Sequence, residues 1–129
     1  MFPYIETSSY LCLKIIMVIR FEVIFLKEAI EFISKLEEKA RKKVFYNIDK
    51  ARLLNDPKLF EKLEDDIWYF RTKYSTKQYR VFAFWDKNDN KNTLVIATHG
   101  VIKNNKVAKS EIERAKQIRK EYFENKNKK

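Results

Sequence analysis

Two arginines, Arg71 and Arg80, stand in apolar runs of the sequence, WYFR and YRVFAFW. Alternating side chains predict that each arginine lies on a strand, and the two strands follow one another along the chain. A guanidinium is costly to bury without a partner, so each must reach solvent, pair with an acid or face a functional surface. Structural partners could be Asp65, Asp66 and Asp86. A functional partner would be a phosphate, because the planar guanidinium donates two hydrogen bonds to it at fixed charge.

The only histidine, His99, directly precedes the only glycine, Gly100. We interpret the pair as the end of a strand, with the glycine required by a positive φ or by close approach of another group. Three lysines follow without an intervening acid: Lys103, Lys106 and Lys109. His99 could exchange protons near neutral pH, and the lysines could bind phosphates. The alternative is a strand that ends in a turn with solvated lysines beyond it.

The charge and the aromatic residues favour a polyanionic partner. The net charge is +10, and the 71–109 segment holds nine Lys or Arg against two acids. Such an excess attracts phosphates and releases counterions on binding. A solubilising surface or an acidic protein partner would also explain it. Tyr74 and Tyr79 could stack on bases, with sheet packing as the equal alternative, whereas for Tyr69 we favour sheet packing.

Several classes of protein are disfavoured by what the sequence lacks. One cysteine allows no intrachain disulfide and no cysteine cluster for zinc, and a reducing cytoplasm fits this usage. A single glycine excludes the P-loop and the G-x-G-x-x-G motif, and no H-E-x-x-H or serine-hydrolase signature is present. No apolar run has the length of about 18 residues expected of a membrane span. We therefore expect no metal, no cofactor and no membrane association.

The hydrophobic periodicity predicts an α+β domain of order β-α-α-β-β-β-α. Its antiparallel strands form a meander, and its helices pack on one face. The expected elements are a strand at 18–26, helices at 27–43 and 44–54, a short helical turn from Pro57 through Leu63, strands at 66–72, 79–86 and 93–99, and a helix at 109–123.

The chain is expected to form one domain. A clear strand pattern begins after Met17, so we interpret residues 1–16 as an N-terminal extension and Met17 as the start of translation. Residues 17–124 then form the domain, and residues 125–129 form a charged tail.

Four short motifs in order resemble the RelE/ParE superfamily of bacterial type II toxins, in its phage-derived, HigB-like branch. They are IWYFR at 67–71, YRVFA at 79–83, HGV at 99–101 and SEIERA at 110–115. This resemblance covers residues 62–123, and a weaker one extends back to Met17.

The resemblance implies the RelE-like fold and an mRNA endoribonuclease that commonly acts on ribosome-bound mRNA. It also implies inhibition by an antitoxin encoded beside the toxin. The toxin would then contact operator DNA only through this antitoxin. A metal-free ribonuclease can use the RNA 2′-OH as nucleophile. Arg71 and Arg80 would then bind the scissile phosphate, and His99 or Lys103 would act as acid or base. Tyr74, Tyr79, Lys106 and Lys109 would bind the flanking RNA.

Two departures from the family pattern leave alternatives open. Val101 replaces the usual aromatic residue after His-Gly, and the lysine loop at 103–108 is shorter and lacks a proline. The superfamily also contains ParE-like inhibitors of DNA gyrase, so the fold alone does not decide the activity. A third possibility is a degenerate toxin that only binds its antitoxin and helps to repress the operon.

Overall fold

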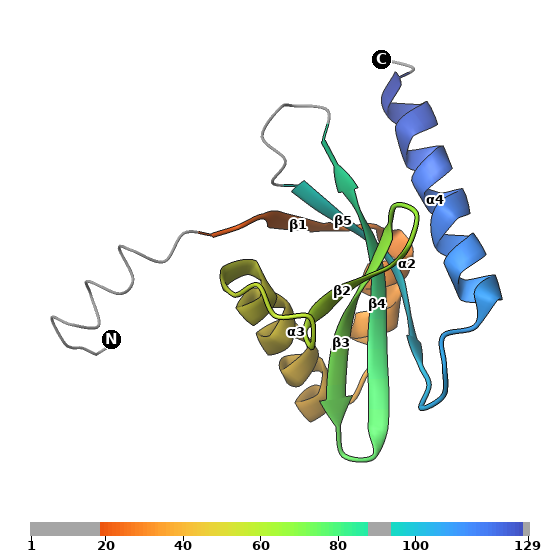
Figure 1. Cartoon of the computed structure of the whole chain (residues 1–129). Coiled ribbons are helices and arrows are strands. Elements are labelled where there is room, and N and C mark those ends of the chain that lie inside the picture. The colour runs from red at the N-terminus through yellow and green to blue at the C-terminus, as the bar shows by residue number, and fades with distance from the viewer. Residues whose placement is uncertain (1–18, 88–93, 128–129) are drawn as a thin grey trace, which may run out of the picture.

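Five strands form one mixed sheet in the residues that this computed structural model describes, 19–87 and 94–127. The order across the sheet is β1-β5-β4-β3-β2 (Figure 1). β1 runs parallel to β5, and every other neighbouring pair is antiparallel. The strands are β1 (Glu22–Phe25), β2 (Phe60–Glu64), β3 (Ile67–Tyr74), β4 (Lys77–Asp86) and β5 (Leu94–Ile102).

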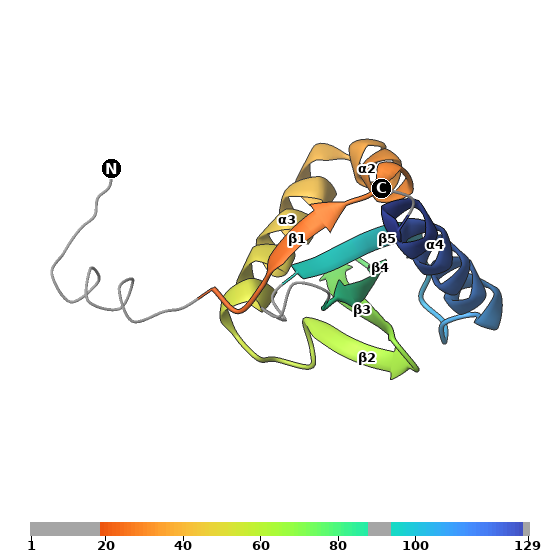
Figure 2. The same cartoon turned by 90° about the horizontal axis from the view of Figure 1, so that it is seen from above.

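Three helices cover the two faces of this sheet unequally. They are α2 (Lys27–Ser34), α3 (Glu38–Leu53) and α4 (Lys109–Asn127). α2 and α3 share one apolar cluster with the sheet, whereas α4 packs in a second cluster. Figure 2 shows α3 and α4 on opposite sides of the stack of strands. Our expectation that all helices pack on one face is therefore wrong, because β4 is apolar on both faces and each face needs a cover.

The alternation along β4 divides its side chains between the two clusters. Val81 and Ala83 belong to the cluster under α2 and α3. Phe82 and Phe84, both fully buried, belong to the cluster under α4. Burying each such aromatic side chain contributes about 1.5–3 kcal/mol, so both faces stabilise the fold.

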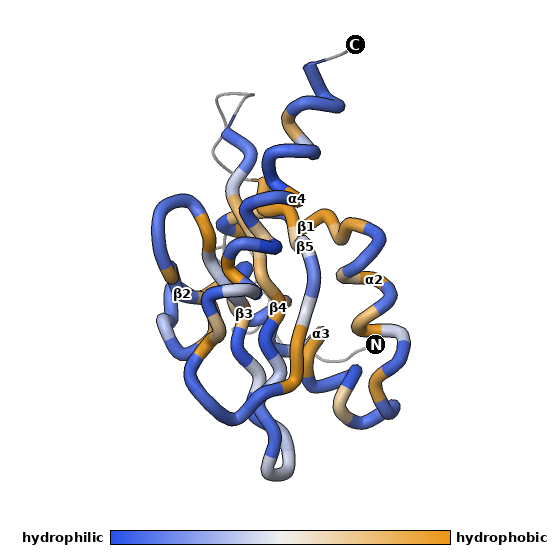
Figure 3. Tube along the Cα trace, turned by 90° about the vertical axis from the view of Figure 1, so that its right-hand side faces the viewer, coloured by the Kyte–Doolittle hydropathy of each residue, from blue (hydrophilic) through white to orange (hydrophobic). Residues whose placement is uncertain are grey.

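α4 is attached to the sheet by a narrow apolar stripe and by ion pairs along its sides. Ile112 and Ala115 are buried in the second cluster, while most of the helix is hydrophilic (Figure 3). Lys116 pairs with Glu64 at 3.1 Å and with Asp65 at 3.0 Å, beside the turn between β2 and β3. The hydrogen bonds that Lys116 donates to Asp65 and Glu64 raise its pKa. These contacts fix α4 relative to β2 and β3.

Near its C-terminus α4 is also held by a buried carboxylate. Asp86, at the end of β4, accepts hydrogen bonds from Tyr122 at 2.8 Å and from Lys126 at 2.6 Å. It is therefore a partner of α4 and not of the arginines, contrary to one of our alternatives. α4 continues to Asn127, so residues 125–127 of the expected tail are helical.

The α+β class and the order of the elements are confirmed, with one additional strand. Residues that we expected in a helical turn form β2, whose pairing with β3 shifts between Lys62 and Glu64. Alternation along β2 places Phe60 in one cluster and Leu63 in the other. We expected a helical turn because Asp56 and Pro57 are typical of the start of a helix. The boundary between the first two helices also differs, because the apolar stripe continues from Ile33 to Ala40 across the turn between α2 and α3.

Gly100 lies inside β5 and not at a strand end, since this strand runs on to Ile102. Its φ is not positive. A Cβ atom at this position would lie 2.2 Å from Cδ2 of Phe32 on α2. Close approach is therefore the reason for the glycine, which is one of the two alternatives that the sequence left open.

Residues 1–16 and most of the predicted loop before β5 lie outside the described residues, so their interpretation stays a prediction. Within residues 19–87 and 94–127, no helix is long and apolar enough to cross a membrane.

Candidate active site

Arg71 and Arg80 lie directly opposite one another on β3 and β4. The two residues are Cα partners in the antiparallel register. Arg71 follows Tyr69 on its strand face, and Arg80 precedes Phe82, both in the cluster under α4. The arginines therefore project on the α4 side of the sheet, just beyond its apolar part. The sequence predicted neighbouring strands, and the register places the two arginine residues opposite one another on one face.

Arg80 is buried without an acidic partner among the described residues. Only 6 % of it is exposed, and its Nε and Nη1 atoms form no hydrogen bond. Its remaining contact is a long hydrogen bond of 3.5 Å from Nη2 to the amide oxygen of Gln78. A buried cation left unpaired costs several kcal/mol, whereas an anion that binds beside it would recover much of that cost.

Arg71, by contrast, is neutralised within the protein. Its Nη2 atom lies 2.7 Å from Oε1 of Glu61, the second residue of β2. The same nitrogen donates a hydrogen bond to the hydroxyl of Tyr69, and that hydroxyl donates to Glu61 at 3.1 Å. The acid that pairs with Arg71 is thus Glu61, and not one of the three aspartates that we had considered.

A cavity opens on the side chain of Arg80. Its lining includes Tyr69 from β3, Lys106 from the loop after β5 and Ile112 from α4, together with Arg80 itself. A second cavity lies beside the start of β2, and its lining includes Lys58 and Leu59 before that strand, Arg71 from β3 and Asn47 from α3. The two arginines therefore line two different cavities, and the one at Arg80 also contains Lys106.

His99 is packed beneath the start of α4 rather than in the Arg80 cavity. It is 7 % exposed and stacks on Phe82, with ring centroids 4.8 Å apart. Its Nε2 atom lies 3.1 Å from Oε1 of Glu111, and its Nδ1 atom lies 3.0 Å from the hydroxyl of Thr98. Burial lowers the pKa of His99, and the hydrogen bond with Glu111 opposes that shift. Both ring nitrogens are thus engaged within the protein.

The three lysines after β5 are exposed, and they differ in position. Lys106 lines the Arg80 cavity. Lys103 lies where the chain leaves β5, with its backbone N–H donating to the carbonyl of Gln78 at 3.0 Å. Lys109 is the first residue of α4. The structure therefore brings Lys106 to the arginines and leaves Lys103 and Lys109 on the surrounding surface.

Tyr74 and Tyr79 lie on the other face of the sheet. Tyr79 is 5 % exposed in the cluster under α2 and α3, and burial raises the pKa of its hydroxyl. Tyr74 packs partly buried against the same cluster. A buried ring on that face is not available to stack on a base bound at the arginines. Tyr69, which we had interpreted as sheet packing, is the tyrosine that lies at the site.

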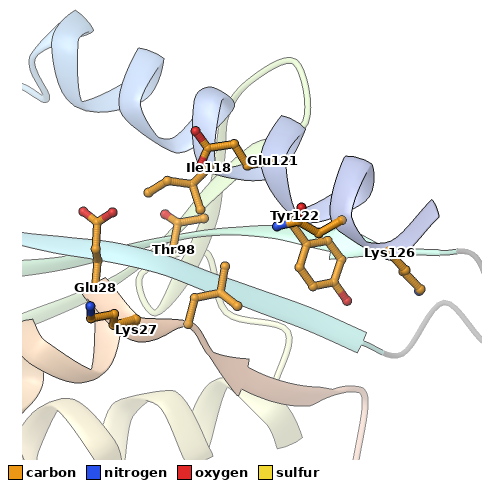
Figure 4. Close-up of a pocket in the computed structure, with 9 residues that line it drawn as sticks. Lys27, Glu28, Thr98, Ile118, Glu121, Tyr122 and Lys126 are labelled. Carbon is orange, nitrogen blue, oxygen red and sulfur yellow. The ribbon is translucent and has the colours of Figure 1, made fainter. Parts of the chain in front are cut away.

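Another hollow lies elsewhere, between α2, β5 and α4. Figure 4 shows Glu28, Thr98, Ile118 and Tyr122 around it. Its lining is mainly apolar, and its charged residues are of both signs. It therefore lacks the uncompensated positive charge of the arginine site.

Sequence reasoning missed Glu61, Tyr69 and Glu111 as members of these polar contacts. A signal existed for Glu111, because it stands in the first turn of the predicted helix that follows His99. Glu61 gave no signal, since its segment was assigned to a helical turn. Among the described residues, no group of three or more His, Cys, Asp or Glu could hold a metal ion.

A family model described as "Phage derived protein Gp49-like (DUF891)" matches residues 31–120. The chain belongs to this Gp49-like family. It is a RelE-like family associated with the toxins of toxin–antitoxin systems. The matched part of this Gp49-like protein includes both arginines, His99 and the three lysines. No curated protein matches the chain.

Proposed function

We propose that this Gp49-like protein is the toxin of a type II toxin–antitoxin system, in the HigB-like branch, and that it is a metal-independent mRNA endoribonuclease. The observation that carries the proposal is Arg80, a buried cation that has no acidic partner among the described residues. It lies directly opposite Arg71 on the neighbouring strand. A phosphodiester is the anion that suits this position, because the net charge of +10 already favours a polyanion.

In the proposed reaction the 2′-oxygen of the RNA attacks the adjacent phosphorus and the 5′-oxygen leaves. Negative charge grows on the non-bridging oxygens, where a buried guanidinium is worth more than in water. Arg80 would bind these oxygens, and Arg71, opposite it on the neighbouring strand, would contact an adjacent phosphate. Lys106 at the cavity and Lys103 and Lys109 around it would bind the flanking backbone.

Its partner would be a cognate antitoxin encoded next to the toxin, and its substrate would be mRNA, free or on the ribosome. The exposed basic residues around the arginine site would suit an acidic segment of such an antitoxin. Operator DNA would be contacted only through the antitoxin.

Induced expression in a bacterial host tests the proposal, with growth followed and the 5′ ends of mRNA mapped. We expect growth arrest and new 5′ ends inside translated frames. Arrest with intact mRNA would instead indicate an inhibitor of gyrase, which a supercoiling assay would detect. Absence of arrest from a folded protein would indicate a toxin-derived protein that only binds an antitoxin.

The variant that tests the role of Arg80 is Arg80→Met, which keeps much of the side-chain volume and removes the charge. We expect cleavage to fall by at least about 100-fold, as for the loss of a donor that stabilises charge in the transition state. Thermal unfolding should show equal or greater stability, because an unpaired buried cation has been removed. Lys42→Met, on the exposed side of α3, removes the same unit charge and should cleave normally. Normal cleavage by Arg80→Met would exclude Arg80 from the site.

A further inference from the structure

Three side chains meet at one point beside the arginine site. Oε1 of Glu61 accepts a hydrogen bond from Nη2 of Arg71 at 2.7 Å and another from the hydroxyl of Tyr69 at 3.1 Å. The same Arg71 nitrogen donates to the Tyr69 hydroxyl oxygen. One carboxylate oxygen, one phenol and one guanidinium nitrogen therefore form a closed set of contacts.

The direction of these hydrogen bonds follows from the chemistry of the groups. Arg71 can only donate, and ionised Glu61 can only accept. The single proton of the Tyr69 hydroxyl therefore points to Glu61, while its oxygen accepts from Arg71. That oxygen can accept one further hydrogen bond, because a hydroxyl has two lone pairs. A hydroxyl group of a ligand in the cavity could supply it.

Tyr69 is placed between the reaction site and solvent. It lines the cavity together with Arg80, and its ring stacks on Phe82 at a centroid distance of 6.3 Å. Tyr69 itself is 5 % exposed, whereas the side chain of Glu61 is 42 % exposed. A proton that reaches Glu61 can therefore be released to water outside the cavity.

We propose that Tyr69 is a catalytic residue that passes the 2′-OH proton to Glu61; this rests on the proposed ribonuclease function. The 2′-oxygen forms its bond to phosphorus as its proton moves to Tyr69 Oη, and the phenolic proton moves to Glu61 Oε1. The bond from phosphorus to the 5′-oxygen breaks, and the 5′-oxygen takes a proton from water. The products are a 2′,3′-cyclic phosphate and a 5′-hydroxyl, and Glu61 returns its proton to solvent.

Other titratable groups near Arg80 are less suited to this step. Both ring nitrogens of His99 are engaged, with Thr98 and Glu111, and His99 does not line the cavity. Glu64 lines the cavity but pairs with Lys116 at 3.1 Å. The groups facing Glu61 from β3 are Tyr69 and Arg71, and Arg71 keeps the accepting oxygen in place.

Single-turnover cleavage of an mRNA, with ribosomes added if the wild type needs them, tests the relay in Tyr69→Phe, Glu61→Gln and the double variant. We expect each single variant to cleave about 100-fold more slowly at saturating RNA, the usual scale of general acid–base catalysis. The double variant should be little slower than either, because the two groups act as one unit. Binding of an RNA with a 2′-deoxy residue at the cleavage site should not change.

A pH series separates proton transfer from packing. The wild-type rate should depend on pH because the relay moves a proton, and Glu61→Gln should remove this dependence. Controls are Tyr46→Phe on the exposed side of α3 and Glu22→Gln, whose carboxylate pairs with Arg52 at the far edge of the sheet. Both controls should cleave as the wild type does.

The outcomes distinguish the relay from the function on which it rests. Wild-type cleavage with near-normal rates in Tyr69→Phe and Glu61→Gln would overturn the relay and leave the ribonuclease intact. Slower cleavage that comes only from weaker RNA binding would assign these residues to structure, and would also overturn it. Absence of cleavage by the wild type under every condition would remove both proposals.

Discussion

The two arginines of the site are chemically identical but differ in their neighbours. Arg71 is paired with Glu61, so the protein has already neutralised it. Arg80 has no such acid among the described residues and is nearly as buried as the apolar core. The second arrangement destabilises the folded protein unless a ligand binds. A buried arginine without an acidic partner therefore indicates function more strongly than several exposed lysines do.

His99 is a buried residue whose contacts connect two elements of the fold. It joins β5 to the first turn of α4 through Glu111, and burial lowers its pKa below the ordinary value. The folded protein therefore prefers neutral His99 more strongly than the unfolded chain does. Stability from this group is complete above the ordinary histidine pKa of about 6.5 and is lost as pH falls below it, because the unfolded chain binds the proton first.

We predict that the free energy of unfolding falls between pH 7.5 and 5.5, with a slope of at most about 1.4 kcal/mol per pH unit from this residue. His99→Gln should have a shallower slope over the same range. Since the chain has one histidine, the NMR titration of its ring protons can be followed without assignment. A midpoint above that of a free histidine would contradict the prediction.

At the scale of elements, α2 and β5 approach so closely that they leave no space for a methyl group. Gly100→Ala would place a Cβ atom 2.2 Å from the Phe32 ring, although alanine in a strand is otherwise favoured over glycine. We predict a loss of about 1–3 kcal/mol in the free energy of unfolding, measured with urea. In a Phe32→Ala background the same substitution should cost nothing further. A loss equal in both backgrounds would show that the ring is not the cause.

The strands that carry the arginines could be predicted from the sequence because their periodicity is regular. Alternation placed Arg71 with Tyr69, and Arg80 with Phe82, on one face each. The register that sets Arg71 opposite Arg80 depends on the turn between β3 and β4. Ser75 in this turn has a φ of 59°, and the turn contains no glycine by which the sequence could have predicted it.

The rest of the site could not be predicted for physical reasons. The strand that supplies Glu61 follows Asp56 and Pro57, which are typical of a helix start, so we assigned it to a helical turn. An apolar stripe shows that a helix packs against a sheet but not on which face, so α4 was placed wrongly. The engagement of His99 depends on that same helix. Sequence periodicity therefore predicts elements, whereas polar partners depend on how the elements are assembled.

At the scale of the whole molecule, the lysines after β5 are exposed, whereas the charge of Arg80 is buried. For a single-stranded nucleic acid, each tenfold rise in salt lowers the logarithm of the binding constant by about 0.7 per phosphate contact. We predict that Lys103→Gln, Lys106→Gln and Lys109→Gln together reduce that slope by about 2. Binding would be measured with uncleavable 2′-deoxy-substituted RNA. Replacing three exposed lysines of α3, Lys39, Lys42 and Lys50, serves as the control, and an equal effect there would contradict a local role.

The order of strands has a consequence for how the protein is made. β1 pairs only with β5, from which it is separated by most of the chain. A ribosome delivers β1 before β5, so the first strand has no strand partner until β2, β3 and β4 have been made. α4, which closes the cavity through Ile112, is delivered later still. A nascent chain therefore carries both arginines before it carries the helix that completes the cavity at Arg80.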